Sequence, residues 1–334
     1  MTTLVVGGAG YIGSHAVYQL IDRGEDVVVI DNLETGHREA LHPKARFYEG
    51  DIRDRAFLNT VFTNEAIEQV VHFAANSLVG ESMQNPLKYY DNNVFGTQCL
   101  LEAMVAHGAK RIVFSSTAAT YGEQELMPIT ETAETRPTST YGETKLAMEK
   151  MIRWTEAAHG LRYVSLRYFN VAGARQGGVI GEDHQPETHL LPLVLEVANG
   201  RREAISIFGT DYPTPDGTCI RDYIHVEDLI EAHLLALRYL EEGGASDVFN
   251  LGSSTGFSVE EMIEEARAVT GHAIPTIEQA RRAGDPPRLI ASSEKAKRIL
   301  GWEPSRTDVK RIIQDAWDWH RTHPNGYKTE VTSE

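Results

Sequence analysis

The feature that most constrains this fold is a glycine-rich turn directly after a short β-branched run at the N-terminus. Residues 3–6 are expected to form a buried strand, and Gly7-Gly8-Ala9-Gly10-Tyr11-Ile12-Gly13 follows at once. Glycines at these places permit a tight turn and a close approach of the backbone to a pyrophosphate. A helix over residues 11–23 would point its N-terminus at that anion. If the glycine motif is considered alone, a glycine turn that binds no ligand is the alternative.

A carboxylate in the right place strengthens the dinucleotide interpretation. Residues 26–31 predict a second buried strand that ends at Asp31, 18 positions after Gly13. A carboxylate there would accept hydrogen bonds from both ribose hydroxyls of NAD and would repel the 2′-phosphate of NADP. Strand, glycine motif, helix, strand and acid together predict an NAD-binding unit.

The pattern of strands and helices continues along the chain and predicts an α/β fold, a doubly wound parallel sheet of the Rossmann type with a smaller mixed α/β substrate domain. We expect residues 1–169 to bind NAD and residues 170–334 to bind mainly the substrate, with the chain free to cross back between the two. Asn92-Asn93 lies in a long helix, where one amide is expected to hold the backbone beside the site; an exposed polar pair is the alternative. Further strands are expected at 46–50, 69–73, 111–116 and 163–167, and helices at 86–107, 141–159, 226–240 and 258–271.

Tyr141 and Lys145 form a candidate base. Four residues apart on a helix, they share one face, and the ammonium is expected to lower the phenol pKa toward the working pH. Such a base can take a proton from a sugar hydroxyl. By itself the pair is more typical of an exposed helix face. Ser115 and Ser116 end the fifth expected strand and Thr117 stands just past it, at the carboxyl end where ligands of open parallel sheets bind.

Composition narrows the classes of function. The chain has 334 residues and a formal net charge of −16, which argues against nucleic acid or an anionic membrane as partner. Cys99 and Cys219 give no disulfide framework and no metal-ligand spacing, so no metal is expected. We find no signal peptide and no apolar run that could span a membrane, and we expect a cytoplasmic protein.

These motifs together resemble the extended short-chain dehydrogenase/reductases. The resemblance rests on the glycine motif, Asp31, the Ser115-Ser116-Thr117 strand end and Tyr141-x-x-x-Lys145. Within that family the chain is similar to the UDP-glucose 4-epimerases (galactose epimerases). The matching stretches run nearly end to end: residues 7–15, 89–94, 166–170, 208–213, 216–226 and 249–252.

The resemblance implies the cofactor contacts. They extend from the glycine turn through the strand ends to the base. The NAD-binding residues implied in this way are Gly7, Gly8, Gly10, Tyr11, Ile12, Gly13, Asp31, Asn32, Leu33, Glu34, Thr35, Gly36, Asp51, Ile52, Phe73, Ala74, Ala75, Asn76, Ser77, Asn92, Ser115, Tyr141, Lys145 and Phe169.

It also implies contacts to a UDP-sugar. Arginines suit a diphosphate, and an acidic protein must concentrate them locally, although for Arg221 a structural ion pair is an equal alternative. Thr117 stands where the family often has Ser, and His189 where some relatives have Asn. Leu289 matches the position that limits space near the sugar C2 substituent. The residues implied to bind the UDP-sugar are Thr117, Tyr141, Asn170, His189, Leu190, Phe208, Arg221, Arg282, Asp285 and Leu289.

The implied reaction is interconversion of UDP-glucose and UDP-galactose. Tyr141 would remove the O4 proton while a hydride leaves C4 for tightly bound NAD, and the 4-keto sugar would turn over and take the hydride back. Lys145 would favour the phenolate, and Thr117 would hydrogen-bond O4. The resemblance also implies a homodimer through the helices 86–107 and 141–159, whose apolar residues include Leu146, Met148, Met151 and Ile152.

Three alternatives remain. A sugar 4,6-dehydratase would typically need Asp-Glu just after the strand-end hydroxyl, where this chain has Ala118-Ala119. An epimerase of another UDP-sugar, such as an N-acetylhexosamine, pentose or uronate, is harder to exclude. A non-catalytic NAD-binding sensor would not need Thr117, Tyr141 and Lys145.

Overall fold

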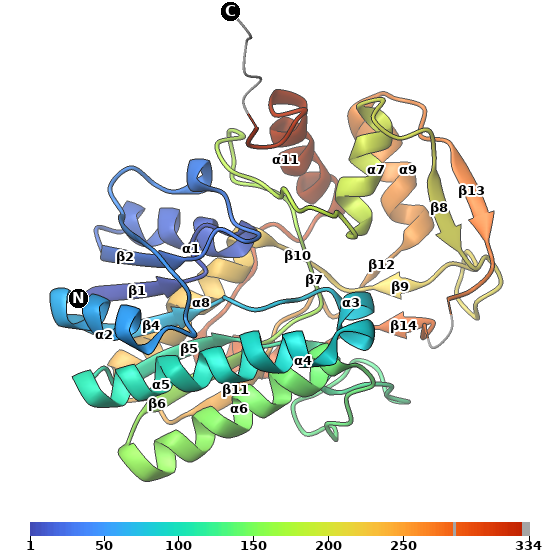
Figure 1. Ribbon diagram of the computed structural model, residues 1–334. Helices are drawn as coiled ribbons and strands as arrows, with labels where there is room; N and C mark the ends of the chain where they lie inside the picture. Colours follow the sequence, from blue (N-terminus) through green and yellow to red (C-terminus); the bar gives the residue numbers. More distant parts are fainter. Residues whose placement is uncertain (283–284, 329–334) are drawn as a thin grey trace, which may run out of the picture.

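The computed structural model describes residues 1–282 and 285–328, and its centre is a seven-stranded, wholly parallel sheet (Figure 1). The order of the strands reverses direction between β1 and β4, which is the switch point of a doubly wound sheet. The predicted fold class is therefore confirmed. From one edge to the other the strands are β3 (Arg46–Glu49), β2 (Asp26–Asp31), β1 (Thr2–Val6), β4 (Ile67–His72), β5 (Arg111–Ser115), β6 (Arg162–Arg167) and β11 (Asp247–Asn250).

Helices cover both faces of this sheet. Alternate side chains of β1 enter different cores: Leu4 and Val6 pack with α2, α5 and α6, whereas Val5 packs with α1, α8 and α10. A strand buried on both sides needs apolar residues at nearly every position, which explains its continuous apolar sequence. The covering helices are α1 (Tyr11–Asp22), α8 (Val226–Glu241) and α10 (Glu294–Leu300) on one face and α2 (Arg55–Asn64), α5 (Gly96–His107) and α6 (Thr140–His159) on the other.

Residues 86–107, expected to form one helix, are helical but change between α-helical and π-helical geometry. It consists of α4 (Pro86–Tyr89), a π-helical segment η2 (Tyr90–Phe95) and α5. The π segment contains Asn92 and Asn93, which are both buried. The Asn93 side chain binds the backbone of Asn76 through both its oxygen and its nitrogen. A π-helix is wider than an α-helix, and π segments often occur where a side chain has a particular role. Here that side chain is the buried amide of Asn93, which holds the backbone of Asn76.

A smaller unit lies beside the carboxyl ends of the sheet. Its core is formed by three helices, and it also contains three small sheets (Figure 1). Ser258 caps α9 with a capping box, which confirms the expected helix start. Its elements are β7 (Asn170–Ala172), α7 (Leu190–Ala198), β8 (Ile205–Phe208), β9 (Ile220–Arg221), β10 (Tyr223–His225), β12 (Phe257–Ser258), α9 (Val259–Thr270), β13 (Thr276–Gln279), β14 (Arg288–Leu289) and α11 (Val309–Thr322), and α3 (Val79–Gln84) lies near it.

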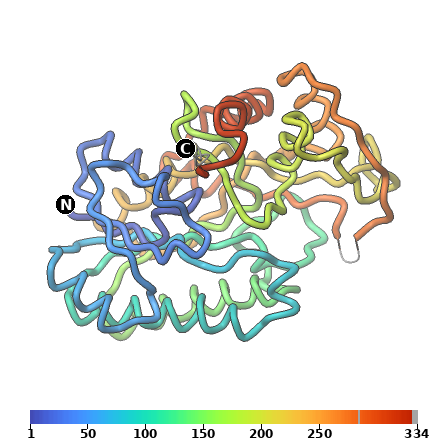
Figure 2. The backbone as a smooth tube through the Cα atoms, turned by 45° about the horizontal axis from the view of Figure 1, so that its top comes forward, coloured from blue at the N-terminus to red at the C-terminus, as the bar shows by residue number. Residues whose placement is uncertain are grey.

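The chain passes between the two units more than once. After β10 it returns to the large sheet to form α8 and β11, and after β14 it returns again to form α10. Figure 2 shows this path, with an orange segment running back among the blue N-terminal residues. The second half of the chain therefore supplies one strand and two helices of the large unit, and the division at residues 169 and 170 stays a prediction.

Three of the four tryptophans contribute to the hydrophobic cores. Trp302, Trp317 and Trp319 are buried and serve packing. Among the residues that the structure describes, no helix combines the length and the apolar character that crossing a membrane requires.

Buried histidines make the stability of this fold sensitive to acid. Burial lowers the pKa of His15 and His72 to about 3 and that of His233 and His320 to about 4. The unfolded chain takes up protons near the ordinary histidine pKa of about 6.5, so it binds more protons than the folded chain below that pH. Stability from these groups is present above pH 6.5 and is lost as the pH falls toward 4.

We predict that His233→Gln flattens the dependence of unfolding free energy on pH. Removal of one such group should reduce the slope by at most about 1.4 kcal/mol per pH unit between about pH 4.5 and 6. Urea unfolding at fixed protein concentration across that range measures the slope. His159→Gln, at an exposed position, is the matched control and should leave it unchanged. Equal slopes for all three proteins would contradict the prediction.

Candidate active site

The glycine turn lies between β1 and α1 and has no room for side chains. Gly7 has φ +82°, and a Cβ on it would lie 2.7 Å from the Ala74 nitrogen. A Cβ on Gly13 would lie 2.0 Å from the Gly7 oxygen. Gly10 is the N-cap of α1, and no side chain of the described residues caps that helix end. Backbone N–H groups at the start of α1 are thus available to an anion such as a pyrophosphate.

Asp31 lies beside this turn at the end of β2. Its Oδ2 accepts a hydrogen bond from the Ala9 nitrogen at 2.9 Å, and its Oδ1 accepts one from the Leu33 nitrogen at 2.9 Å. Burial raises the pKa of Asp31, while these two backbone donors oppose the rise. A carboxylate oxygen can accept more than one hydrogen bond, so Asp31 remains able to bind ribose hydroxyls.

The other expected cofactor residues surround the same edge of the sheet. Asn32 donates to Asp51 at 3.3 Å and so links the ends of β2 and β3. The nitrogens of Phe73 and Ala74 both donate to the Val6 oxygen, which brings the end of β4 against the end of β1. The small residues after β4 thereby face the glycine turn. The predicted NAD-binding residues on β1, β2, β3 and β4 meet at one place, as an NAD site requires.

Of the two asparagines in the π segment, Asn93 is the one that holds the backbone. Its Oδ1 accepts from the Asn76 nitrogen at 2.8 Å, and its Nδ2 donates to the Asn76 oxygen at 3.0 Å. It also donates to Thr144 on α6 at 3.1 Å. Asn92 in turn donates to Asn93 at 3.0 Å. The expectation of a positioning amide is confirmed, and the contact of Asn92 with NAD stays a prediction.

Tyr141 is in the first turn of α6, next to the end of β5. Ser139 caps the helix by accepting from the Gly142 nitrogen. A Cβ on Gly142 would lie 2.6 Å from the Ala119 oxygen, so glycine permits the close approach of α6 to the segment after β5. The Thr117 side chain lies next to the Tyr141 phenol and acts to lower its pKa. The structure thus brings two of the three predicted catalytic side chains into contact.

Lys145 lies one turn further along α6 and is buried. Its Nζ donates to the Ser115 oxygen at 2.8 Å and lies 5.0 Å from the centre of the Phe114 ring. Burial lowers its pKa to about 7, opposed by the nearby charge of Glu149. Lys145 therefore connects α6 to the end of β5 and is close to losing its proton at neutral pH.

The expected lowering of the Tyr141 pKa does not occur in this structure. Burial raises it to about 12, and the neighbouring Thr117 side chain only partly opposes the rise. The reason is that the Lys145 ammonium is directed at the Ser115 oxygen, while desolvation disfavours the phenolate. The sequence spacing correctly placed both side chains on one helix but could not predict the desolvation.

A buried ion pair beneath these residues was not anticipated. Arg167 at the end of β6 donates through Nε to Glu149 of α6 at 2.9 Å, and its Nη2 contacts the other carboxylate oxygen. Ser116 donates to the same carboxylate, and Arg167 lies 4.8 Å from the centre of the Tyr121 ring. Glu149 follows Lys145 by four residues, so helical spacing was the signal that could have located it.

The expected UDP-sugar residues fall into two groups. Asn170, at the start of β7, donates to the Asp222 oxygen at 3.3 Å. Phe208, Arg221 and Leu289 lie on β8, β9 and β14, whereas Arg282 and Asp285 lie between β13 and β14. The Arg282 guanidinium lies 3.9 Å from the centre of the Phe208 ring, and Leu289 is paired in register with Arg221. Arg221 forms an ion pair with Asp285, so the structural alternative weighed for that arginine is observed.

The second group is at the start of α7. His189 is the N-cap of this helix and Leu190 its first residue. The Nδ1 atom of His189 lies 2.7 Å from Glu182 and 3.3 Å from Glu187. That nitrogen is therefore directed at two carboxylates, and a contact of His189 with substrate stays a prediction.

The positions diagnostic of a dehydratase carry no acid. Ala118 and Ala119 belong to a short 3-10 turn, η3 (Ala118–Thr120), which Thr117 caps. The Ala118 nitrogen donates to the Tyr168 oxygen, so this turn is fixed to the end of β6. At these two positions no carboxyl group is present for an elimination.

Comparisons with known proteins agree with this geometry. Residues 3–252 match the model of the NAD dependent epimerase/dehydratase family. A UDP-glucose 4-epimerase of Lacticaseibacillus casei is 60% identical over 327 residues, which are 98% of this chain and 99% of that protein. A crystal structure of a UDP-glucose 4-epimerase, 60% identical, has a TM-score of 0.98 and covers 98% of this chain and 100% of its own.

A third comparison concerns ligands. The UDP-glucose 4-epimerase of Bifidobacterium longum, solved in complex with NAD+ and UDP, is 38% identical to this chain. Its TM-score is 0.92, and the match covers 98% of this chain and 100% of that one. With a family model matched over most of its length and relatives this similar, the chain belongs to the NAD dependent epimerase/dehydratase family.

Proposed function

We propose that this protein is an NAD-dependent 4-epimerase that interconverts UDP-glucose and UDP-galactose. The observation that carries the proposal is the placement of Tyr141 next to Thr117 at the carboxyl edge of the sheet, with Lys145 on the same helix. The relatives described above are named for this activity and match this chain over nearly their whole length. The residues of this chain supply the chemical groups that the reaction needs.

The residues at the glycine turn fit NAD. The turn has room for a pyrophosphate bound by backbone N–H groups because side chains are excluded at Gly7 and Gly13. Asp31, beside the turn, can accept hydrogen bonds from the ribose hydroxyls. When bound there, NAD supplies the acceptor and later the donor of a hydride at C4 of the sugar. Because the hydride is returned, no net oxidation takes place and no second redox partner is needed.

Side chains of the protein transfer the proton. Tyr141 removes the proton from O4 and returns it at the end of the cycle. Thr117, whose side chain lies next to Tyr141, holds O4 in position. Lys145 anchors α6 to the end of β5, and its charge would support the phenolate together with that of the cationic nicotinamide ring. The 4-keto sugar formed in this way turns over within the site before it is reduced on the other face.

The second unit supplies the groups for the nucleotide part. Arg282 and Arg221 present permanently charged donors for a diphosphate. Arg221 is held by Asp285, and Asn170 lies where the chain passes from the large sheet into the second unit. Binding of UDP by these residues would place the sugar between β9 and β14 on one side and Tyr141 on the other.

We also place the enzyme in the cytoplasm. Cys99 and Cys219 are both buried and do not bridge each other. Free cysteines are typical of proteins in a reducing compartment.

Tyr141→Phe should retain NAD and lose turnover. Incubation of the purified wild type with UDP-galactose is expected to produce UDP-glucose, and the variant should be slower by about 10²–10⁴-fold, the usual value of a positioned base. Steady-state rates and the NAD released on denaturation are the measurements. Tyr163→Phe is the matched control, because Tyr163 is buried in the core beneath α6 and has no role in the proposed site. Activity of Tyr141→Phe within about threefold of wild type would remove the base assignment.

We further propose a homodimer that forms through the helices α4, α5 and α6. Of the four apolar residues named from the sequence, Leu146, Met148 and Ile152 are buried within the chain and do not provide its surface, and Met151 is partly buried against the same core. The same helices instead expose other apolar side chains: Leu87 is 80% exposed and Trp154 is 69% exposed. Apolar side chains exposed on neighbouring helices favour pairing across a two-fold axis.

Light scattering on the purified protein should therefore give the mass of two chains. Trp154→Glu places a charge on the proposed interface and should shift the equilibrium toward one chain. Ile277→Glu, at an exposed apolar position on β13 of the smaller unit, is the matched control and should remain a dimer. A wild-type mass of one chain across micromolar concentrations would refute the dimer, and equal behaviour of the two variants would refute this interface.

Leu289 is expected to set the preference among UDP-sugars. It lies on β14 beside Arg221, and crowding near the C2 substituent should disfavour an N-acetyl group by about 10–200-fold. UDP-galactose should thus be strongly preferred over UDP-N-acetylgalactosamine, with low but detectable activity on the latter. Leu289→Ser should raise the second activity more than the first. Leu126→Ser, at an exposed position, is the control, and an unchanged ratio of kcat/KM values in Leu289→Ser would show that Leu289 does not line the pocket.

A further inference from the structure

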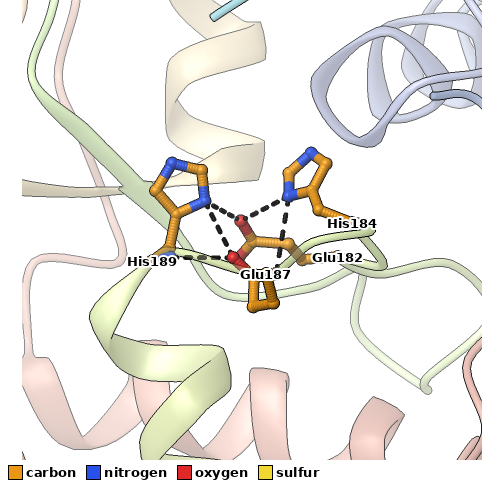
Figure 3. A group of neighbouring side chains, drawn as sticks. All are labelled: Glu182, His184, Glu187 and His189. Atoms are coloured by element: carbon orange, nitrogen blue, oxygen red, sulfur yellow. Dashed lines mark hydrogen bonds and ion pairs between the residues drawn. The ribbon is translucent and has the colours of Figure 1, made fainter. Parts of the chain in front are cut away.

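Four side chains with metal-binding atoms converge in the segment that connects β7 to α7. They are Glu182, His184, Glu187 and His189 (Figure 3), and one atom from each lies within 4.8 Å of the others. No metal was expected from the sequence, because its two cysteines have no metal-ligand spacing. None of the four side chains takes part in the proton transfer proposed above.

The distances between these atoms suit a common cation. His184 Nδ1 lies 3.2 Å from Glu182 Oε1 and 3.5 Å from Glu187 Oε2. His189 Nδ1 lies 2.7 Å from Glu182 Oε1 and 3.3 Å from Glu187 Oε1. Ligands at about 2.0–2.2 Å from a tetrahedral zinc ion lie about 3.4 Å from one another. Three of the four distances, at 3.2–3.5 Å, are close to that spacing, and the 2.7 Å pair of His189 and Glu182 would have to widen when an ion binds.

A buried oxygen in the cluster has no hydrogen bond. Glu182 is 5% exposed, and within residues 1–282 and 285–328 neither its Oε1 nor Nδ1 of His184 has a hydrogen-bond partner. The two atoms face each other at 3.2 Å without the geometry of a hydrogen bond. The polar neighbours of Glu182 Oε1 at ion-pair distance are the Nδ1 atoms of His189 at 2.7 Å and His184 at 3.2 Å, and a buried carboxylate is costly without positive charge beside it. A cation between Glu182 and the histidines would satisfy both atoms at once.

The backbone orients another member of the cluster. Glu187 Oε1 accepts hydrogen bonds from the nitrogens of Thr188 at 2.7 Å and His189 at 2.8 Å. Partners of this kind fix ligating carboxylates in protein metal sites. The ring of His184 packs edge-on against Tyr11 at 6.2 Å between centres. The donors are thus held by the surrounding structure and are not loose surface groups.

We propose that Glu182, His184, Glu187 and His189 bind one divalent transition-metal ion of the zinc class. Two imidazoles and two carboxylates form a nitrogen–oxygen donor set that suits Zn²⁺ and Co²⁺ better than Mg²⁺ or Ca²⁺. With four protein ligands the site is closed, as in structural rather than catalytic metal sites.

The position of the site indicates what the ion does. The Tyr11 hydroxyl donates to the Gly173 oxygen, and His37 contacts the Asp183 oxygen at 2.9 Å. The segment before α7 is therefore attached to the glycine turn of the large unit on one side, while His189 caps α7 of the smaller unit on the other. An ion bound by this segment fixes the start of α7 relative to the cofactor edge.

The first test uses the full chain without regard to its activity. The purified protein is stripped with a chelator and titrated with Zn²⁺ and, separately, with Co²⁺. Elemental analysis after gel filtration should give one zinc per chain, Co²⁺ should give the visible absorption of tetrahedral coordination, and Zn²⁺ should raise the melting temperature. A wild-type chain that retains no zinc and gives no such absorption would overturn the proposal, because the cluster would then be a set of ion pairs only.

Variants assign the ion to the cluster. His184→Gln and His189→Gln each remove one ligand and should weaken Zn²⁺ binding by more than the roughly 10–100-fold that changes outside the ligand shell cost. His159→Gln, at the exposed end of α6, should bind as wild type does. Binding by His184→Gln and His189→Gln that matches wild type would overturn the proposal. These measurements do not depend on epimerase activity, so loss of the proposed function would leave their result intact.

Discussion

A parallel sheet must be covered on both faces, and this requirement organises the whole chain. The strands of this sheet are too apolar to face water, and each face has its own core. The first 169 residues supply α2, α5 and α6 for one face but only α1 for the other. Helices α8 and α10 and the strand β11 must therefore come back from the second half. The interleaving of the two units is a consequence of this need for cover, and it holds the smaller unit firmly beside the carboxyl edge.

The same edge concentrates charges that are costly to bury. Lys145, Glu149 and Arg167 lie together at the contact between α6 and the ends of β5 and β6. Removing one partner from a buried pair typically costs about 3–5 kcal/mol because a charge is left uncompensated. The pair Glu149–Arg167 therefore fixes where α6 can lie on the sheet, and α6 carries Tyr141. Positioning of the base depends on residues that do not touch the proposed substrate.

Local patterns in the sequence were sufficient for the large sheet and the cofactor edge. The strand 26–31 and the start of α1 at Tyr11 were predicted at the correct residues, because glycine, charge and apolar runs mark their ends. The strand β11 was missed: four residues with a polar residue at each end give little periodicity, and only pairing with β6 makes them a strand. The π segment was missed because it accompanies a contact between Asn93 and Asn76, which are 17 residues apart. Contacts between distant residues are also what brings Glu149 to Arg167.

The ionisation state of Tyr141 could not be predicted from the local sequence. Burial acts on both members of the proposed pair, raising the pKa of Tyr141 to about 12 and lowering that of Lys145 to about 7. Both shifts favour the neutral forms, so a phenolate at neutral pH needs positive charge beyond what Lys145 supplies while it is directed at Ser115. In the proposed reaction that charge is the cationic nicotinamide ring. The base is then a property of the complex between chain and cofactor, and proton removal is confined to the state in which a hydride acceptor is present.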